Sequence, residues 1–168
     1  DNDSDDDGLY DGWELSMGLD PLNSSDAGED FDGDGLTNIE EFWHGTDPLK
    51  PDSDFDGLND SYEINLMLDP MDEDTDDDGV LDGYEIAIGT NPFLIDSDFD
   101  GLNDSYELQL GTNPLCNDTD GDGIIDGVEI EIGTNPLSRD SDLDGIDDMD
   151  ELELDLNPRR RDSDSDFI

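Results

Sequence analysis

Acidic residues recur along this chain at a spacing that suits a hard metal cation. The pattern Asp-x-Asp-x-Asp-Gly-x-x-Asp-x-x-Glu, with Asn38 at position nine of the second copy, begins seven times, at Asp3, Asp30, Asp52, Asp74, Asp96, Asp118 and Asp140. Alternate carboxylates converge on one ion only where the backbone turns sharply, and the glycine at position six permits such a turn. Calcium prefers a shell of several carboxylate and carbonyl oxygens. The repeated unit therefore predicts a calcium-binding loop.

The loop resembles the calcium loop of EF-hand proteins, as the copy at residues 118–129 illustrates. That resemblance implies side-chain ligands at positions one, three, five and nine, a backbone carbonyl at position seven, and a glutamate at position twelve that binds with both oxygens. The predicted ligands are Asp3, Asp5, Asp7, Leu9, Asp11, Glu14, Asp30, Asp32, Asp34, Leu36, Asn38, Glu41, Asp52, Asp54, Asp56, Leu58, Asp60, Glu63, Asp74, Asp76, Asp78, Val80, Asp82, Glu85, Asp96, Asp98, Asp100, Leu102, Asp104, Glu107, Asp118, Asp120, Asp122, Ile124, Asp126, Glu129, Asp140, Asp142, Asp144, Ile146, Asp148 and Glu151. An eighth copy supplies Asp162, Asp164 and Asp166, although Phe167 stands where the glycine belongs.

The interval between copies is 27 residues at first and 22 thereafter. A fixed period of this kind is typical of a repeat array, in which each unit packs on its neighbours. Five extra residues around Asn23–Gly28 account for the longer interval, and we expect them to form a looped-out surface segment. We interpret the chain as a window from a longer array. The predicted repeats are 1–29 with the insertion, 30–51, 52–73, 74–95, 96–117, 118–139 and 140–161, followed by a truncated copy at 162–168.

A short apolar stretch follows each loop, and a glycine usually follows that stretch. Glycine just past a helix end, with proline soon after, is a helix stop. We therefore predict a helix of about two turns from position nine of each copy. Met67 and Asp155 replace the glycine in two copies, so those ends should close differently. The predicted fold is an elongated, calcium-stabilised array or solenoid of irregular loops and short helices, with little or no β-sheet.

An Asp-Pro or Asn-Pro pair follows each predicted helix. Proline makes the preceding residue extended. The Asp or Asn either forms a turn or supplies an extra calcium ligand to a neighbouring repeat. The residue after the proline should pack on the apolar residue at position seven; these residues are Leu22, Leu49, Met71, Phe93, Leu115 and Leu137.

The chain carries 53 acidic and 5 basic residues, which gives a formal net charge of −48. Charge of this density must be neutralised before the chain becomes compact, and it excludes nucleic acid as a partner. One Ca²⁺ would leave each five-carboxylate loop near about −3, and a second ion sharing ligands would leave about −1. We therefore expect at least one ion per complete repeat, with two as an alternative. No run approaches the roughly 18 apolar residues of a transmembrane segment.

The few apolar side chains of a 22-residue repeat cannot by themselves offset the entropy of ordering it. Calcium must supply part of the difference. Extracellular modules bind calcium with a Kd of about 0.1–1 mM, and at about 2 mM calcium such a site gains up to roughly 1.8 kcal/mol. The same sites would be empty at cytosolic calcium concentrations. This predicts a secreted protein that is extracellular or at a cell surface.

The repeats resemble the bacterial and archaeal form of thrombospondin type 3 repeats, D-S/T-D-x-D-G-L-x-D-x-x-E-x-x-x-G-T-D/N-P. The match is best at residues 74–92, 96–114 and 118–136. Animal repeats of this family carry regular disulfides, whereas this chain has only Cys116, which favours a prokaryotic source. The resemblance implies a stiff calcium-wrapped array that serves as a stalk, spacer or fibre subunit, with other copies of itself or surface adhesion partners, and without catalysis.

Other functions compete with a structural array. A dockerin-like, calcium-dependent protein-binding or adhesion module is the main alternative, because dockerin loops recur at a similar spacing. A calcium sensor needs helices that open onto a groove, and the connections here are too short for them. An enzyme has no support, because His44 is the sole histidine and no nucleophile–base pair is evident.

Three further sets of residues have two interpretations each. Bulky residues at loop position four either contact another chain or pack over the next repeat; they are Phe55, Phe99 and Leu143. Asn-x-Ser/Thr sequons are either glycosylation sites or chance matches in an Asn- and Ser-rich chain; they start at Asn2, Asn23, Asn59, Asn103 and Asn117. Aromatic residues near position eleven belong either to the core or to a sugar-binding surface, the core being favoured; they are Trp13, Trp43, Tyr62, Tyr84 and Tyr106.

Overall fold

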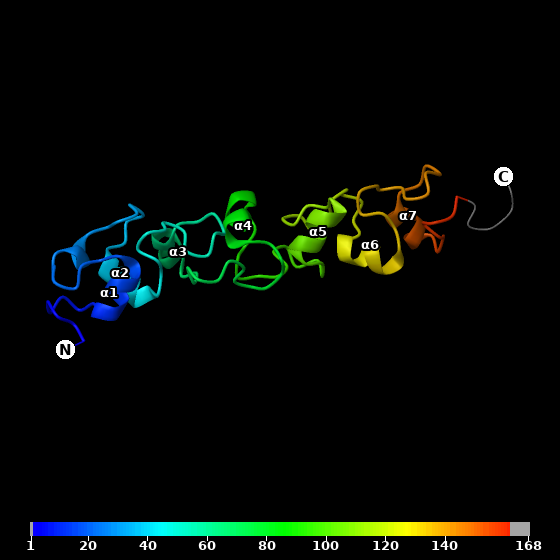
Figure 1. The fold of residues 1–168 in the computed structure, drawn as a ribbon. Helices are drawn as coiled ribbons and strands as arrows, with labels where there is room; N and C mark the ends of the chain where they lie inside the picture. The colour runs from blue at the N-terminus through cyan, green and yellow to red at the C-terminus, as the bar shows by residue number, and fades with distance from the viewer. Residues whose placement is uncertain (1, 162–168) are drawn as a thin grey trace. The chain divides into compact units, whose positions relative to one another are not determined.

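A computed structural model of the chain describes residues 2–161. Within that range it contains seven short α-helices, one 3-10 helix and no strand (Figure 1). The elements are α1 (Asp11–Met17), η1 (Asp26–Gly28), α2 (Asn38–His44), α3 (Asp60–Leu66), α4 (Asp82–Ile88), α5 (Asp104–Leu110), α6 (Asp126–Ile132) and α7 (Asp148–Glu153). The predicted fold class of loops with short helices is confirmed, and the eighth loop copy lies outside the described residues.

Every α-helix begins at loop position nine, as predicted. In α6, the N–H of Asp126 donates to the carbonyl of Asn117, the residue just before the loop, at 3.0 Å. This bond closes the loop around its own carboxylates. Side chains cap some helix starts: Asn59 and Asn103 each accept a hydrogen bond from the backbone N–H three residues later. Such caps satisfy backbone donors that lack partners at a helix start.

Five helices are followed by a glycine in the left-handed conformation, namely Gly18, Gly45, Gly89, Gly111 and Gly133. The prediction that Met67 would force a different ending is wrong. Met67 adopts the same left-handed geometry with φ 67°, and its N–H donates to the carbonyls of Glu63 and Ile64. The other exception does differ: α7 ends one residue earlier, and Asp155 takes φ 56°.

Met67→Gly should therefore stabilise the chain. A side chain in the left-handed region costs of order 1–3 kcal/mol, whereas glycine adopts it freely. The Met67 side chain is 87% exposed, so its removal forfeits little packing. We expect the free energy of unfolding in saturating calcium to rise by about 1 kcal/mol, measured by denaturant titration. Gly111→Met, at the equivalent position, should lower it by a similar amount; an unchanged value for both would refute the strain argument.

The apolar core is thin and recurs once per repeat. Residues at loop position seven are buried in five copies: Leu9, Leu36, Val80, Leu102 and Ile124. The proline of the Asx-Pro pair is buried with them in six copies: Pro48, Pro70, Pro92, Pro114, Pro136 and Pro158.

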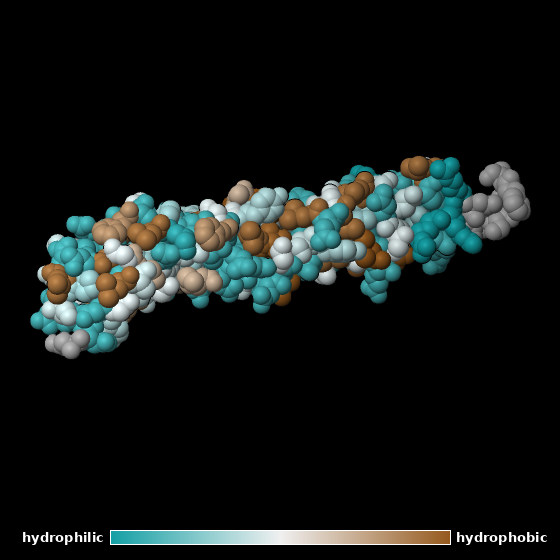
Figure 2. Space-filling model, in the orientation of Figure 1, coloured by the Kyte–Doolittle hydropathy of each residue, from teal (hydrophilic) through white to brown (hydrophobic). Residues whose placement is uncertain are grey.

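The residues that follow the prolines were predicted to pack on position seven, and all six are at least half exposed or nearly so. Their exposed fractions run from 49% at Leu137 to 78% at Leu22. The proline ring itself takes the inner position, so the next side chain turns outward. Four of the five aromatic residues near or beyond position eleven are likewise exposed, Trp13 being the exception. Figure 2 accordingly shows brown apolar residues on the visible surface among teal polar ones.

The largest apolar cluster joins the first two repeats through the insertion. Leu9, Leu19 and Ala27 are buried, and Trp13, Met17, Ile39 and Phe42 pack against them. The Phe42 ring lies edge-on to Trp13 with ring centroids 5.0 Å apart, and α1 and α2 lie side by side (Figure 1). The insertion therefore does not loop out as predicted. It forms η1 and buries Ala27, because the chain there has an apolar neighbour surface on which to pack.

The chain divides into two compact units at the fourth loop. Unit 1 runs to Thr75 and also includes Leu81–Glu85, whereas unit 2 contains Asp76–Val80 and the residues from Ile86 onward. Among the described helices, none has the length and apolar composition needed to cross a membrane.

Candidate metal centre

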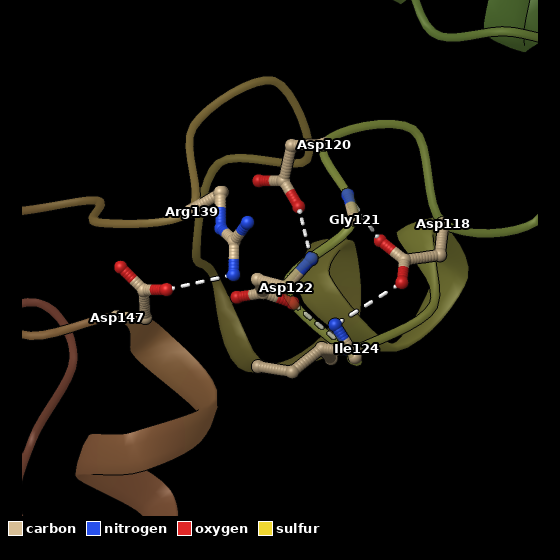
Figure 3. Close-up of polar contacts among 8 residues, drawn as sticks. Asp118, Asp120, Gly121, Asp122, Ile124, Arg139 and Asp147 are labelled. Atoms are coloured by element: carbon tan, nitrogen blue, oxygen red, sulfur yellow. Dashed lines mark hydrogen bonds and ion pairs between the residues drawn. The ribbon is translucent and has the colours of Figure 1, made fainter.

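The aspartate at loop position one shapes the turn. In the sixth copy, Asp118 Oδ1 accepts the N–H of Gly121 at 2.8 Å, and Oδ2 accepts the N–H of Gly123 at 3.1 Å. Figure 3 shows this carboxylate lying against the backbone that it folds. Position four is left-handed in every complete copy, so each loop makes the same reversal. The carboxylate at position one therefore has a structural role as well as a predicted ligand role.

In the sixth copy, positions three and five each use one carboxylate oxygen for the loop and leave the other without a hydrogen bond. Asp120 Oδ1 accepts the N–H of Asp122 at 3.1 Å, and Asp122 Oδ1 accepts the N–H of Ile124 at 2.7 Å (Figure 3). The second oxygen of each side chain is buried without a hydrogen-bond partner among the described residues. The same holds for Oδ2 of position three in four other copies: Asp32, Asp54, Asp98 and Asp142.

The glutamate at position twelve is fully buried in all seven copies. Within the described part of the chain, both carboxylate oxygens of Glu14, Glu41, Glu63 and Glu151 lack a hydrogen-bond partner. Glu107 and Glu129 use one oxygen to accept a threonine hydroxyl and leave Oε2 unpaired. Burial of an ionised carboxylate without a partner is costly unless a cation balances it.

The donor set fits calcium. Ligand oxygens of position one, three and five aspartates lie within 4.8 Å of one another, as in the groups Asp3–Asp5–Asp7, Asp30–Asp32–Asp34 and Asp52–Asp54–Asp56. The unpaired buried oxygens belong to carboxylates and to the Asn38 amide, which is the hard oxygen chemistry that Ca²⁺ selects. These positions would hold the ion, and the glutamate would supply its two oxygens from the first turn of the helix.

The aspartate at position nine is engaged differently. Asp126 accepts the backbone N–H of Thr119 at 2.8 Å and its hydroxyl at 2.6 Å, one bond on each carboxylate oxygen. The same pair of bonds recurs between position two and position nine at Ser53–Asp60, Thr75–Asp82, Ser97–Asp104 and Ser141–Asp148. Position nine therefore braces the loop, and its predicted ligand role remains a prediction.

Position two is the functional residue that sequence reasoning missed. A signal was present, since six of the seven complete copies have Ser or Thr there. The exception, Phe31, stands in the one copy whose position nine is Asn38. The hydroxyl also links repeats: Thr119 Oγ1 accepts the N–H of Asn113 at 2.9 Å. Asn113 Oδ1 accepts the N–H of Leu115 at 3.3 Å, which supports the turn-forming role of the residue before proline.

A second contact joins four of the loops, the second to the fifth, to the helix of the next repeat. The position-five carboxylate accepts the N–H of position ten, 27 residues later: Asp56 Oδ2 from Gly83 at 2.7 Å and Asp100 Oδ2 from Gly127 at 3.1 Å. Where position ten is serine, as at Ser61, the hydroxyl also donates to the carbonyl of the position-five residue, here Asp34, at 2.6 Å. Neighbouring repeats are thereby linked through a predicted ligand.

Burial raises the pKa of the position-twelve glutamates well above the ordinary 4.5, and nearby aspartate charges add to the effect. The pKa of Glu63 rises to about 9, those of Glu41, Glu107 and Glu129 to about 8, and those of Glu14 and Glu151 to about 7. Each side chain faces two or more aspartates of its own loop. Without a cation, these carboxylates bind protons instead.

This predicts opposite pH responses with and without calcium. A glutamate whose folded-state pKa is raised stabilises the fold fully below about pH 4.5, and that contribution is lost as the pH rises through about 7–9. In chelator, helical circular dichroism should therefore fall between about pH 5 and 9. In calcium it should hold or increase, because the ion requires the deprotonated ligand. Equal pH profiles in the two conditions would contradict the assignment.

The family of the chain follows from its repeats. A family model described as the bacterial TSP3 repeat matches residues 3–24, 30–51, 74–94, 96–115 and 118–138, more than half of the chain. The chain belongs to this family. Bacterial TSP3 repeats are calcium-binding repeats, and the carboxylate groups described above fit that chemistry. No curated protein and no solved structure matched the chain.

Two complete TSP3 copies lie outside these matches, those that begin at Asp52 and Asp140. They are the copies in which Met67 and Asp155 replace the helix-ending glycine. The loop carboxylates are nevertheless complete in both, and Glu63 and Glu151 are as buried as their counterparts. Departure from the family pattern is thus confined to the helix end.

The bulky residues at position four are exposed in this TSP3 array. Phe55 is 70% exposed, Phe99 72% and Leu143 67%, and each has a positive φ. Phe55 also has a contact within the chain, because Lys50 Nζ lies 5.6 Å from its ring centroid, so contact with another chain and packing within the array both remain predictions. Among the sequons, Asn59 and Asn103 have a second role as helix caps, and glycosylation at all five remains a prediction.

Proposed function

We propose that this chain is an extracellular structural array, serving as a stalk, spacer or fibre subunit, in which Ca²⁺ is the folding scaffold. One observation carries the proposal: every complete repeat buries a position-twelve glutamate completely, together with other carboxylates of the same loop. Such a fold is stable only when the negative charge is balanced. A chain of net charge −48 cannot supply the balance from its 5 basic residues.

The contacts between repeats favour a spacer over a sensor. Each position-five carboxylate that binds the next repeat is also a predicted calcium ligand, as at Asp56 and Asp100. Ion binding within one loop therefore orders the junction to the next. The helices are only six or seven residues long, and a sensor opens longer helices onto a groove.

The need for millimolar calcium supports an extracellular or cell-surface location. Loops of this type in extracellular modules bind at about 0.1–1 mM. Partners other than calcium are proposed to be further copies of the chain or surface adhesion partners. A dockerin-like adhesion module is the second candidate function, favoured by the exposed Phe55, Phe99 and Leu143. Pull-down experiments with and without calcium separate the two, because an adhesion module should capture a protein other than the chain itself, and only in calcium.

Removal of calcium should abolish the ordered array. We expect small-angle scattering to show a stiff rod in about 2 mM calcium and an expanded coil in chelator. Equilibrium dialysis should find at least one bound ion per complete repeat. A scattering profile that is indifferent to chelator would refute the role of calcium as the scaffold. Magnesium at the same concentration is the control, because its small octahedral shell suits this loop poorly.

A further inference from the structure

Asp26, in the insertion between the first two repeats, occupies a position that a hydroxyl fills elsewhere. At the regular junctions, the residue before proline donates its N–H to a Ser or Thr hydroxyl six residues later, as Asn135 does to Ser141 at 2.7 Å. At the first junction, Asp20 donates its N–H to Asp26 Oδ2 at 3.0 Å. Asp26 therefore replaces the position-two hydroxyl, and the extra residues follow it.

The second repeat is adapted to this replacement. Its own position two is Phe31, which cannot brace position nine. Position nine is Asn38 rather than aspartate, and its buried Nδ2 donates to the carbonyl of Asp26 at 2.8 Å. An amide is needed there because an aspartate could not donate this bond. The insertion is thus fixed by hydrogen bonds on both sides.

Fixing Asp26 in this way leaves one of its oxygens inside the first repeat. Asp26 is only 3% exposed, and among the described residues Oδ1 has no hydrogen-bond partner. Ligand oxygens of Asp26, Asp7 and Glu14 lie within 4.8 Å of one another. Glu14 is fully buried with both oxygens unpaired, and Asp7 Oδ2 is also unpaired within residues 2–161.

We propose that Asp7, Glu14 and Asp26 form an additional calcium site that belongs to the first repeat. It shares Asp7 with the group Asp3–Asp5–Asp7, and Glu14, the position-twelve glutamate of the same loop, would be shared between the two ions. The regular junctions place a neutral hydroxyl at the equivalent hydrogen-bonding position, as Ser141 does for Asn135. This inference rests on the proposed calcium-dependent folding of the chain.

The site ties the insertion to the first loop. Asp26 opens η1, and the next residue, Ala27, packs with Leu9 and Leu19 in the buried cluster. An ion held by Asp26 and Glu14 would therefore join η1 to α1 and order that cluster. Trp13 is adjacent to Glu14 and packs on Phe42, so its fluorescence reports on this region.

The test uses the full chain in a Trp43→Phe background, which leaves Trp13 as the sole tryptophan. Trp43 is 69% exposed, so its replacement should perturb little. The variants are Asp26→Asn and Asp26→Ser, the latter restoring the hydroxyl of the regular junctions. Glu29→Gln, an exposed residue beside the insertion, is the control with the same charge change. Calcium alone is titrated, with Trp13 emission and the number of bound ions as readouts.

Both Asp26 variants should move the Trp13 transition to at least about tenfold higher calcium, and they should bind about one ion fewer than Glu29→Gln. In chelator, they should be no less stable than the parent, because a buried negative charge has been removed. An unchanged midpoint and ion count would overturn the site. Equal destabilisation with and without calcium would also overturn it, because Asp26 would then act only through its hydrogen bonds. If the parent chain shows no change in Trp13 emission and no bound ions in calcium, the proposed function is overturned as well.

Discussion

Gly127→Ala should destabilise the calcium-saturated chain by about 2–3 kcal/mol, although alanine is the better helix former. Gly127 lies in the first turn of α6, where a Cβ atom would sit 2.2 Å from the carbonyl oxygen of Asp100 and 3.1 Å from its carbonyl carbon. Both obstacles are backbone atoms, so no rotamer change relieves the clash. The Gly127 N–H would also lose its bond to Asp100 Oδ2. Denaturant titration in saturating calcium measures the effect.

Gly12→Ala is the matched control. Gly12 holds the same loop position in α1, but nothing lies within 4 Å of the point that a Cβ atom would occupy there. Alanine at this position should stabilise the helix by about 0.5–1 kcal/mol. The two substitutions are chemically identical, so a difference in sign isolates the contact between repeats. If both variants shift stability in the same direction, helix propensity dominates and the junction does not limit packing.

The contact between position five and position ten takes two forms that alternate from one repeat to the next. Position ten is serine at Ser61 and Ser105 and glycine at Gly83 and Gly127. Serine donates its hydroxyl to the position-five carbonyl of the preceding repeat, whereas glycine allows that carbonyl to approach directly. Two solutions to one packing problem therefore alternate along the chain.

The loops and helix starts could be predicted from sequence because they depend on local geometry. A glycine turn, alternating carboxylates and an acidic helix start are all encoded within twelve residues. The structure of Asn23–Gly28 could not be predicted in this way, because it depends on the apolar surface that Leu9 and Leu19 offer from outside the segment. The left-handed Met67 was also mispredicted, because the favourable bonds at the helix end outweigh a local conformational cost that sequence rules treat as decisive.

The pairing of position two with position nine is a feature that the resemblance to EF-hands did not predict. Asp126 occupies a predicted ligand position, yet both of its oxygens accept hydrogen bonds from Thr119. The distinction is visible only once donors and acceptors are assigned in three dimensions. Most of the oxygens left over after that assignment belong to the carboxylates at positions three and twelve, and they concentrate the negative charge that the cation must balance.

Glu129→Gln should weaken calcium binding at one repeat and stabilise that repeat when calcium is absent. Glu129 is fully buried; its Oε1 accepts the Thr134 hydroxyl at 3.1 Å, and Oε2 lacks a partner among the described residues. Glutamine keeps the size and the acceptor but cannot bind calcium as a bidentate anion. We expect calcium affinity at this loop to fall by at least about tenfold, which is about 1.4 kcal/mol, measured by calorimetry.

In chelator, the effect of Glu129→Gln on the free energy of unfolding should change from destabilising to stabilising. The pKa of Glu129 is raised to about 8 by burial and by Asp120 and Asp122, so ionisation above that pH destabilises the calcium-free fold. Glutamine mimics the protonated form at every pH. The variant should therefore be more stable than the parent in chelator at about pH 9, and the two should converge only below about pH 4.5, where the glutamate is protonated in both the folded and the unfolded chain.

Glu131→Gln supplies the comparison, since Glu131 lies on the same helix two residues later and is exposed. It removes the same charge from the same net total, so long-range repulsion is matched between the variants. Only Glu129→Gln should lower the stability of the chain in calcium and raise it in chelator. If Glu129→Gln lowers stability equally in both conditions, the glutamate supports packing alone. A crossing of the two stability curves would instead mean that the buried charge is tolerated because calcium binds it.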